Sequence, residues 1–167
     1  MKFTLAAVAA TLAMLLTTGV SGVFLAFSTA VMPGLDAVKA GSAIAAMQSI
    51  NQKILNPVFL SHFTGAPLAG LATGGALLLL GQRSAAVLFF VAAGIYLLGA
   101  FLPTVIVNVP MNEALDVTKI PADPAEAARI WTDYSSRWTA WNTLRGVASA
   151  ISVLVMALGL YVWGRNA

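Results

Sequence analysis

Residues 84–112 read SAAVLFFVAAGIYLLGAFLPTVIVNVPMN, a run of 29 residues without a charged side chain. A helix needs about 20 apolar residues to cross the hydrocarbon core of a bilayer, which is about 30 Å thick. Comparable uncharged runs lie between Lys2 and Asp36, Lys53 and Arg83, and Arg145 and Arg165. These runs predict an all-α integral membrane protein, a four-helix bundle that forms a single transmembrane domain over residues 1–167. The predicted spans lie near 4–31, 57–80, 85–109 and 142–163.

The composition of the 167-residue chain agrees with this prediction. Hydrophobic residues make up 59% of it and charged residues only 9%, whereas a soluble domain carries about 25% charged and about 45–50% apolar residues. An ordinary soluble enzyme and a disordered chain are therefore excluded. Nine Lys and Arg residues against six Asp and Glu are too sparse for a phosphate-binding surface, which excludes a nucleic-acid partner.

The first uncharged run has two interpretations. It opens with Lys2 and an Ala/Leu-rich segment, as a secretory signal peptide does. The apolar region of a signal peptide lasts only about 7–15 residues, whereas this run continues without a break through Phe24 and Phe27 to Met32 and Pro33. We therefore favour a membrane span over a cleaved signal.

The distribution of charge predicts an orientation. With four spans, both termini and the Gln82–Arg83 turn lie on one side, which carries Lys2, Arg83 and Arg165 and no acidic residue. The other side carries all six acidic residues and the other six basic ones in two long loops. A raw count of Lys and Arg does not decide the orientation, because the long loops hold more of them. The short, purely cationic side favours termini in the cytoplasm, at the cell membrane if the source is bacterial.

The first long loop, residues 34–56, has a helical periodicity. Apolar residues recur there every three to four positions, with polar residues on the other faces: Ile44, Met47, Ile50 and Ile54 against Gln48, Asn51, Gln52 and Lys53. This spacing predicts a short amphipathic helix that lies on the membrane surface or caps the bundle.

Two helix starts are marked in the sequence. Asn56 followed by Pro57 is typical of an N-cap with proline at the first helical position. The segment Asp123–Pro124–Ala125–Glu126 has Asp at the N-cap, Pro at the first position and Glu at the third, as in a capping box. From there to Trp163 only two isolated glycines interrupt the helical pattern. The fourth helix is therefore predicted to be extended and to begin well outside the membrane.

Several polar side chains fall near membrane depth, where each one costs free energy and needs an explanation. Under the predicted topology they all lie toward the long-loop side of the bundle, where bundle sites are commonly built. They are His62 in the second span, Asn108 and Asn112 at the end of the third, and Asn142 and Arg145 early in the fourth. Aromatic residues lead toward Arg145 at three- to four-residue spacing: Trp131, Tyr134, Trp138 and Trp141.

Most of these residues also have a purely structural interpretation. Trp138 and Trp141 are typical of the aromatic belt at a membrane interface, and Arg145 is long enough to extend to the lipid headgroups. Asn108 and Asn112 flank Pro110, so their side chains are placed to satisfy backbone groups that the proline frees. For His62, the only histidine, we favour a functional role, because an ionisable side chain within a membrane span is costly to keep there.

The sequence predicts no metal site and no cofactor. A single histidine without cysteine, a second histidine or a nearby carboxylate is a poor ligand set. Cysteine is absent from the chain, which excludes disulfides and thiolate nucleophiles and leaves the redox compartment open. The sequence also has no glycine-rich phosphate loop, no Ser–His–Asp order and no haem-attachment motif.

Five segments occur in order along nearly the whole chain: VMPGL at 31–35, AMQSIN at 46–51, NPVF at 56–59, NVPMN at 108–112 and WTAWNTLR at 138–145. Together they resemble the anthrone oxygenase family, a group of small four-span membrane proteins. Most of its bacterial members were long classed as a domain of unknown function. The resemblance implies the activity of the characterised fungal members, which oxidise an anthrone to an anthraquinone with molecular oxygen and no evident cofactor.

This chemistry makes modest demands on the protein. An anthrone is apolar, and its methylene C–H is acidic because the resulting anion is delocalised. A base, an oxyanion partner and a dry cavity then suffice. If the chemistry applies here, we expect His62 as the base and Arg145, Asn108 or Asn142 as oxyanion partners. The expected substrate contacts are Trp138 and Trp141, which would stack on the polycycle, together with Asn112 and Asn51.

Two functions from different classes follow from the sequence. The first is an oxygenase or oxidase of a hydrophobic anthrone- or quinol-like compound. The second is a non-catalytic membrane protein that binds a lipid, a quinone or a partner subunit, and either is compatible with a homo-oligomer. A transporter is disfavoured, because there is no pair of broken helices and no acidic residue inside a span. The enzyme interpretation predicts that His62, Asn108, Asn142 and Arg145 line one cavity near the long-loop end. A His62 ring that faces lipid or tight packing favours the second function.

Overall fold

The structure is a computed structural model that describes residues 2–166. These residues form five continuous helices and contain no β-strand, which confirms the all-α prediction. Two of the five helices include short π-helical segments, labelled η. In chain order the elements are α1 (Lys2–Ala26) with η1 (Phe27–Val31) and α2 (Met32–Asp36); α3 (Ala40–Lys53); α4 (Pro57–Leu79); α5 (Arg83–Tyr96) with η2 (Leu97–Phe101), η3 (Thr104–Asn108) and α6 (Val109–Asp116); and α7 (Pro124–Asn166).

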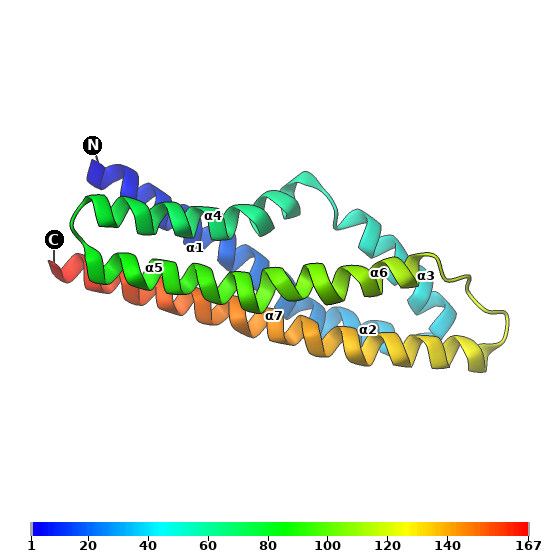
Figure 1. The fold of residues 1–167 in the computed structure, drawn as a ribbon. Coiled ribbons are helices and arrows are strands. Elements are labelled where there is room, and N and C mark those ends of the chain that lie inside the picture. The colour runs from blue at the N-terminus through cyan, green and yellow to red at the C-terminus, as the bar shows by residue number, and fades with distance from the viewer. Residues whose placement is uncertain (1, 167) are drawn as a thin grey trace.

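Four of the helices form a bundle in which each packs against two neighbours (Figure 1). Helix α1 contacts α4 and α7, and α5 contacts the same two helices. Both termini and the α4–α5 turn lie at one end, which we call the turn end. The other end, which we call the loop end, holds α3, α6 and the loop before α7. Helix α7 runs between the two ends and has 43 residues, as predicted for an extended fourth helix.

Three helices are long and apolar enough to cross a membrane: Lys2–Asp36, Arg83–Asp116 and Pro124–Asn166. Their outward faces carry exposed leucines and valines along much of their length, as expected of a surface covered by lipid. Helix α4 completes the bundle but is not among the three. At 23 residues it is long enough for a bilayer, and its lower apolarity comes from His62, Pro67 and four glycines. The second predicted span therefore stays a prediction.

Each π-helical segment precedes a proline that leaves a backbone carbonyl without its usual partner. Proline has no N–H to donate to the carbonyl four residues earlier, and its ring crowds that carbonyl. The carbonyls freed by Pro33, Pro103 and Pro110 belong to Thr29, Gly99 and Ile106, which lie within η1, η2 and η3. Widened turns of this kind are frequent at functional sites, and η1 and η3 border the cavity described below.

Helix α4 contains a proline too, and here a side chain from α5 satisfies the freed carbonyl. Pro67 leaves the carbonyl of Phe63 without its helical donor, and the Tyr96 hydroxyl donates to it at 3.0 Å. Tyr96 is fully buried. Because no water reaches such a position, this hydrogen bond both satisfies the carbonyl and joins α4 to α5.

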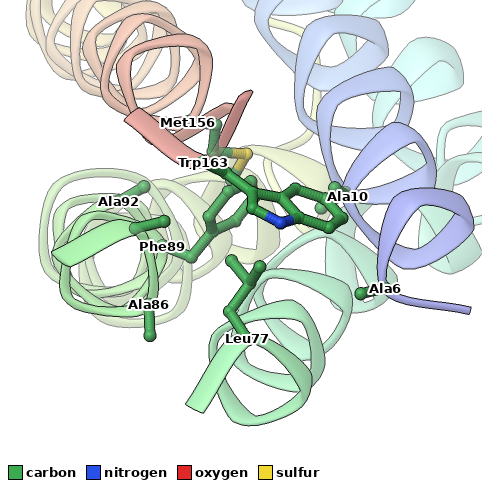
Figure 2. Close-up of a cluster of buried hydrophobic side chains, with 10 residues drawn as sticks. Ala6, Ala10, Leu77, Ala86, Phe89, Ala92, Met156 and Trp163 are labelled. Carbon is green, nitrogen blue, oxygen red and sulfur yellow. The ribbon is translucent and has the colours of Figure 1, made fainter. Parts of the chain in front are cut away.

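The core at the turn end combines small side chains with a few large ones (Figure 2). Alanines of α1 and α5 surround Leu77, Phe89, Met156 and Trp163, and the Trp163 ring extends from α7 toward Ala10 of α1. At Gly74 of α4 a Cβ atom would stand 2.7 Å from the Phe90 ring of α5. Small residues thus allow the close helix contacts on which membrane bundles depend.

The predicted helix starts are confirmed. The Asn56 side chain accepts a hydrogen bond from the Phe59 N–H at 3.0 Å, and Pro57 is the first residue of α4. The Asp123 carboxylate accepts from the Ala125 N–H at 3.1 Å, directly before α7. Both caps are local features, which explains why the sequence alone locates them.

The amphipathic helix predicted in the first long loop is α3, and it caps the bundle. Its apolar face, Ala43, Ile44 and Met47, is buried in a cluster with residues of α2, α6 and α7. The Gln48 amide donates to the carbonyls of Leu115 and Thr118 at 2.8 and 3.0 Å. Leu115 lies in the last turn of α6 and Thr118 comes just after that helix, so Gln48 binds the end of α6 and holds α3 across the loop end.

Candidate functional site

A cavity of about 190 Å³ lies at the loop end, between α1, η3–α6, α7 and the corner that joins α3 to α4. It is somewhat larger than a dry cavity of about 150 Å³ that is known to admit benzene. The cavity is partly open, and its walls are mostly apolar, with four aromatic rings from Phe24, Phe27, Phe59 and Trp138. Its polar lining residues are Asn51, Gln52, Thr104, Asn108, Asn112, Glu113, Asp116, Asn142 and Arg145.

Arg145 places a buried cation in this cavity, with only 4% of its surface exposed. Its two terminal nitrogens donate to Thr104 Oγ1 at 3.0 Å and to Asn142 Oδ1 at 2.9 Å. The Asn142 amide in turn donates to the Phe24 carbonyl and to Ser28 Oγ, both at 2.7 Å. The guanidinium is therefore fixed between three helices, and it does not extend to the lipid headgroups.

No carboxylate pairs with Arg145 in the part of the chain that the structure describes. Its guanidinium instead lies 4.5 Å from the centroid of the Phe24 ring and 5.4 Å from that of Trp138. Its Nε is buried without a hydrogen-bond partner. Burial of an ion without an opposite charge is costly, so this arrangement favours the binding of a negatively charged group in the cavity.

Asn112 organises the aromatic wall of the cavity. Its Oδ1 accepts hydrogen bonds from Trp138 Nε1 at 2.8 Å and from the Tyr134 hydroxyl at 2.9 Å. Asn51 of α3 reaches the same hydroxyl at 3.4 Å. These contacts fix the Trp138 ring from its N–H edge, so that Asn112 joins α6 to α7 rather than satisfying the backbone near Pro110.

Asn108 leaves one polar atom of the site without a partner. Its Nδ2 donates to the Trp138 carbonyl at 3.4 Å, while its Oδ1 is buried without a donor. The orientation of the amide follows from this contact, because a carbonyl only accepts and the group that faces it must be the NH2. The unpaired atom is thus an acceptor, which does not suit the oxyanion role expected from the sequence.

Four polar residues that line the cavity follow one another at four-residue intervals: Thr104, Asn108, Asn112 and Asp116. This spacing keeps them near one face of the helix. Asp116 accepts a hydrogen bond from Gln52 Nε2 at 2.8 Å, which links the cavity-lining ends of α6 and α3. Glu113, beside Asn112 in the sequence, adds a second carboxylate to the lining and is exposed.

The structure brings six of the eight predicted site residues to this cavity: Asn51, Asn108, Asn112, Trp138, Asn142 and Arg145. Trp141 does not line it and is half-buried elsewhere on α7. Thr104, Gln52, Glu113 and Asp116 were not among the predicted residues. The four-residue spacing around Asn108 and Asn112 is the sequence signal that identifies Thr104 and Asp116.

His62 does not line the main cavity either. It lies in a neighbouring pocket of about 170 Å³ with Gly19, Val20 and Val58, and only Val23 and Phe59 border both pockets. Its Nδ1 donates to the Val58 carbonyl at 2.8 Å. A Cβ atom at Gly19 would stand 3.0 Å from the His62 ring, so this ring packs against the backbone of α1.

A comparison with known families adds to this geometry. A family model described as anthrone oxygenase matches residues 57–155, more than half of the chain. The chain belongs to the anthrone oxygenase family. No curated protein and no solved structure matches it. Within residues 2–166, no three His, Asp or Glu side chains are grouped to hold a metal ion.

The segment that the anthrone oxygenase model matches covers α4 and most of α7 with everything between them. It therefore contains the Arg145–Asn142–Thr104 cluster and the polar residues of η3 and α6. The remaining walls, including Phe24, Phe27 and Asn51, come from α1, η1 and α3 outside the matched segment.

Proposed function

We propose that this anthrone oxygenase family member oxidises a hydrophobic anthrone- or quinol-like compound with molecular oxygen, within the membrane and without a cofactor. The observation that carries the proposal is the buried Arg145, which has no carboxylate partner in the described chain and lies in a cavity with aromatic walls. An apolar ring system that becomes an anion during the reaction suits such a cavity, because its new charge forms beside the guanidinium.

The atoms and electrons of the proposed reaction balance with anthrone and dioxygen as the two substrates. Removal of a proton from the methylene carbon of an anthrone gives an anion whose charge is shared with the carbonyl oxygen. Dioxygen accepts electrons from this anion and adds at the same carbon, and loss of water then leaves the second carbonyl. One anthrone and one dioxygen give one anthraquinone and one water, so that no external reductant is needed.

The residues of the cavity have distinct roles in this proposal. Arg145 binds the carbonyl oxygen as it becomes negative. Thr104 and Asn142 already hold the guanidinium in place, so little reorganisation is needed as the charge develops. Trp138, fixed through its N–H by Asn112, offers its ring for stacking against the polycycle.

The test is oxidation of anthrone by the purified protein in detergent, followed as oxygen uptake and anthraquinone formation. Heat-inactivated protein gives the rate of uncatalysed oxidation, which is subtracted. We expect the wild type to exceed this rate, and Arg145→Met to lower kcat/KM by about 10²–10³-fold, the usual effect of removing a group that stabilises an oxyanion. Arg145→Lys should restore little, because one ammonium does not reproduce the planar fork that meets both Thr104 and Asn142.

Folding of the variant is checked by its thermal midpoint in the same detergent. Arg145→Met removes a buried cation without an acidic partner but leaves Asn142 Oδ1 without its donor, so its unfolding temperature is expected close to that of the wild type. Wild-type activity in a folded Arg145→Met protein would contradict the proposal. A wild type that binds anthraquinone saturably, yet oxidises anthrone no faster than heat-inactivated protein, would instead support the non-catalytic function.

A further inference from the structure

The proposed oxidation needs a group that accepts the methylene proton, and the residue expected for this role is not in the cavity. His62 lies in the neighbouring pocket, on the far side of Val23 and Phe59. The main cavity has three titratable lining residues, Glu113, Asp116 and Arg145. Arg145 is a cation with donors only and does not take up a proton. The choice therefore falls between the two carboxylates of α6.

The two carboxylates differ in what they bind. Asp116 accepts a hydrogen bond from the Gln52 amide at 2.8 Å, so its carboxylate is already held by α3. The Glu113 side chain makes no hydrogen bond with another described residue. It also has one more methylene than Asp116, which gives its carboxylate a longer reach from the helix.

The position of Glu113 relative to Arg145 suits the geometry of the substrate. Arg145 is bound to Thr104 at 3.0 Å, and Glu113 is nine residues further along the same continuous helix. At 1.5 Å per residue these positions are at most about 14 Å apart along the axis, a distance that the Glu113 side chain and a bound anthrone cover together. The carbonyl oxygen and the methylene carbon of an anthrone lie on opposite edges of its central ring. One molecule that bridges the cavity thus presents its oxygen to Arg145 and its methylene toward α6.

We propose that Glu113 is the proton acceptor of this site, an inference that rests on the proposed function. Its carboxylate takes the proton as the C–H bond breaks, and the electron pair moves through the ring toward the oxygen beside Arg145. After dioxygen has added, the protonated Glu113 returns the proton to the distal peroxide oxygen. The same carboxylate takes the second methylene proton as the O–O bond breaks and delivers it to the departing hydroxide, which leaves as water.

The test compares Glu113→Gln with Glu126→Gln, which makes the same change at an exposed residue in the first turn of α7, outside the cavity. Each variant is assayed with ordinary anthrone and with anthrone deuterated at the methylene carbon. Glu113→Gln should lower kcat by about 10²-fold or more, the usual contribution of a general base, with little change in KM. Its isotope effect on kcat should exceed that of the wild type, since proton removal becomes the slow step. Glu126→Gln should match the wild type.

Two further variants make the outcome decisive. Glu113→Asp keeps a carboxylate and should therefore retain more of the wild-type activity than Glu113→Gln does. If Glu113→Gln does not fold, Glu113→Asp replaces it as the test. His62→Gln should keep kcat within a few-fold of wild type. Wild-type kcat in folded Glu113→Gln, or a large loss in His62→Gln with none in Glu113→Gln, would overturn the inference while leaving the proposed function intact. An inactive wild type would overturn the proposed function itself and this inference with it.

Discussion

At the scale of single residues, the clearest sign of function is a charge that the fold does not need for its stability. Arg145 has 4% of its surface exposed and is held by neutral partners, with no acid paired to it in the described chain. Desolvation of an ion costs several kcal/mol that neutral hydrogen bonds only partly recover. A hydrophobic residue of similar size would pack in the same space without this cost. The proposed function gives this cation a role, because it places a developing anion beside the guanidinium.

Tyr96 has the opposite character, because its hydroxyl serves the fold. It donates to the Phe63 carbonyl that Pro67 leaves free. We predict that Tyr96→Phe lowers the free energy of unfolding by about 1–3 kcal/mol, the cost of a buried acceptor without a donor. The measurement is the unfolding transition of the purified protein in detergent.

A second substitution separates this mechanism from a general packing defect. In a Pro67→Ala background, residue 67 has an N–H that is able to satisfy the Phe63 carbonyl within α4. Tyr96→Phe should therefore cost less in that background than in the wild type, by roughly 1 kcal/mol in a double-mutant cycle. Equal losses in the two backgrounds would show that Pro67 and Tyr96 are not coupled.

At the scale of elements, α3 is the part of the loop end that depends most on polar contacts. Gln48 ties it to two carbonyls at the end of α6, and Gln52 ties it to Asp116. We predict that Gln48→Ala increases amide hydrogen exchange in α3 and in the last turn of α6, because the Thr118 carbonyl loses its side-chain donor and the Leu115 carbonyl keeps only backbone donors. Ser49→Ala, at the neighbouring exposed position, is the matched control and should leave the exchange rates unchanged. Exchange that rises equally in both variants would contradict the proposed role of Gln48.

The sequence predicts those elements whose signals are local, and it fails where packing decides. The helix caps and α3 were predictable, because the residues that form them are neighbours in the chain. Whether His62 meets the cavity depends instead on how α4 packs against α1, and in the structure its ring lies close to Gly19 of α1. On α7, the three- to four-residue spacing of the aromatic residues was also too coarse to tell which of them face the cavity. At about 100° per residue, Arg145 lies about 20° from Trp138 and Asn142 about 40°, whereas Trp141 lies about 60° away and falls outside the strip of α7 that lines the cavity.

At the scale of the whole molecule, all the acidic residues and the cavity lie toward the same end. The turn end carries Lys2, Arg83 and Arg165 and none of the acidic residues, whereas the loop end holds the cavity and the charged loops beside it. The cavity is not near the middle of the bundle but close to one end of it. Orientation in the membrane therefore decides from which side a substrate or a proton reaches the site.

Because the chain has no cysteine, single-cysteine variants report this orientation without background. The short cationic side predicts termini in the cytoplasm, which places the loop end outside. A membrane-impermeant maleimide added to intact cells should then label Ala122→Cys, in the loop before α7, and label Ser84→Cys at the start of α5 only after lysis; both positions are exposed. The reverse pattern would place the cavity and Glu113 on the cytoplasmic side. Labelling of both variants in intact cells would place the α4–α5 turn and the long loops on the same side, and would contradict the prediction that α4 spans the membrane.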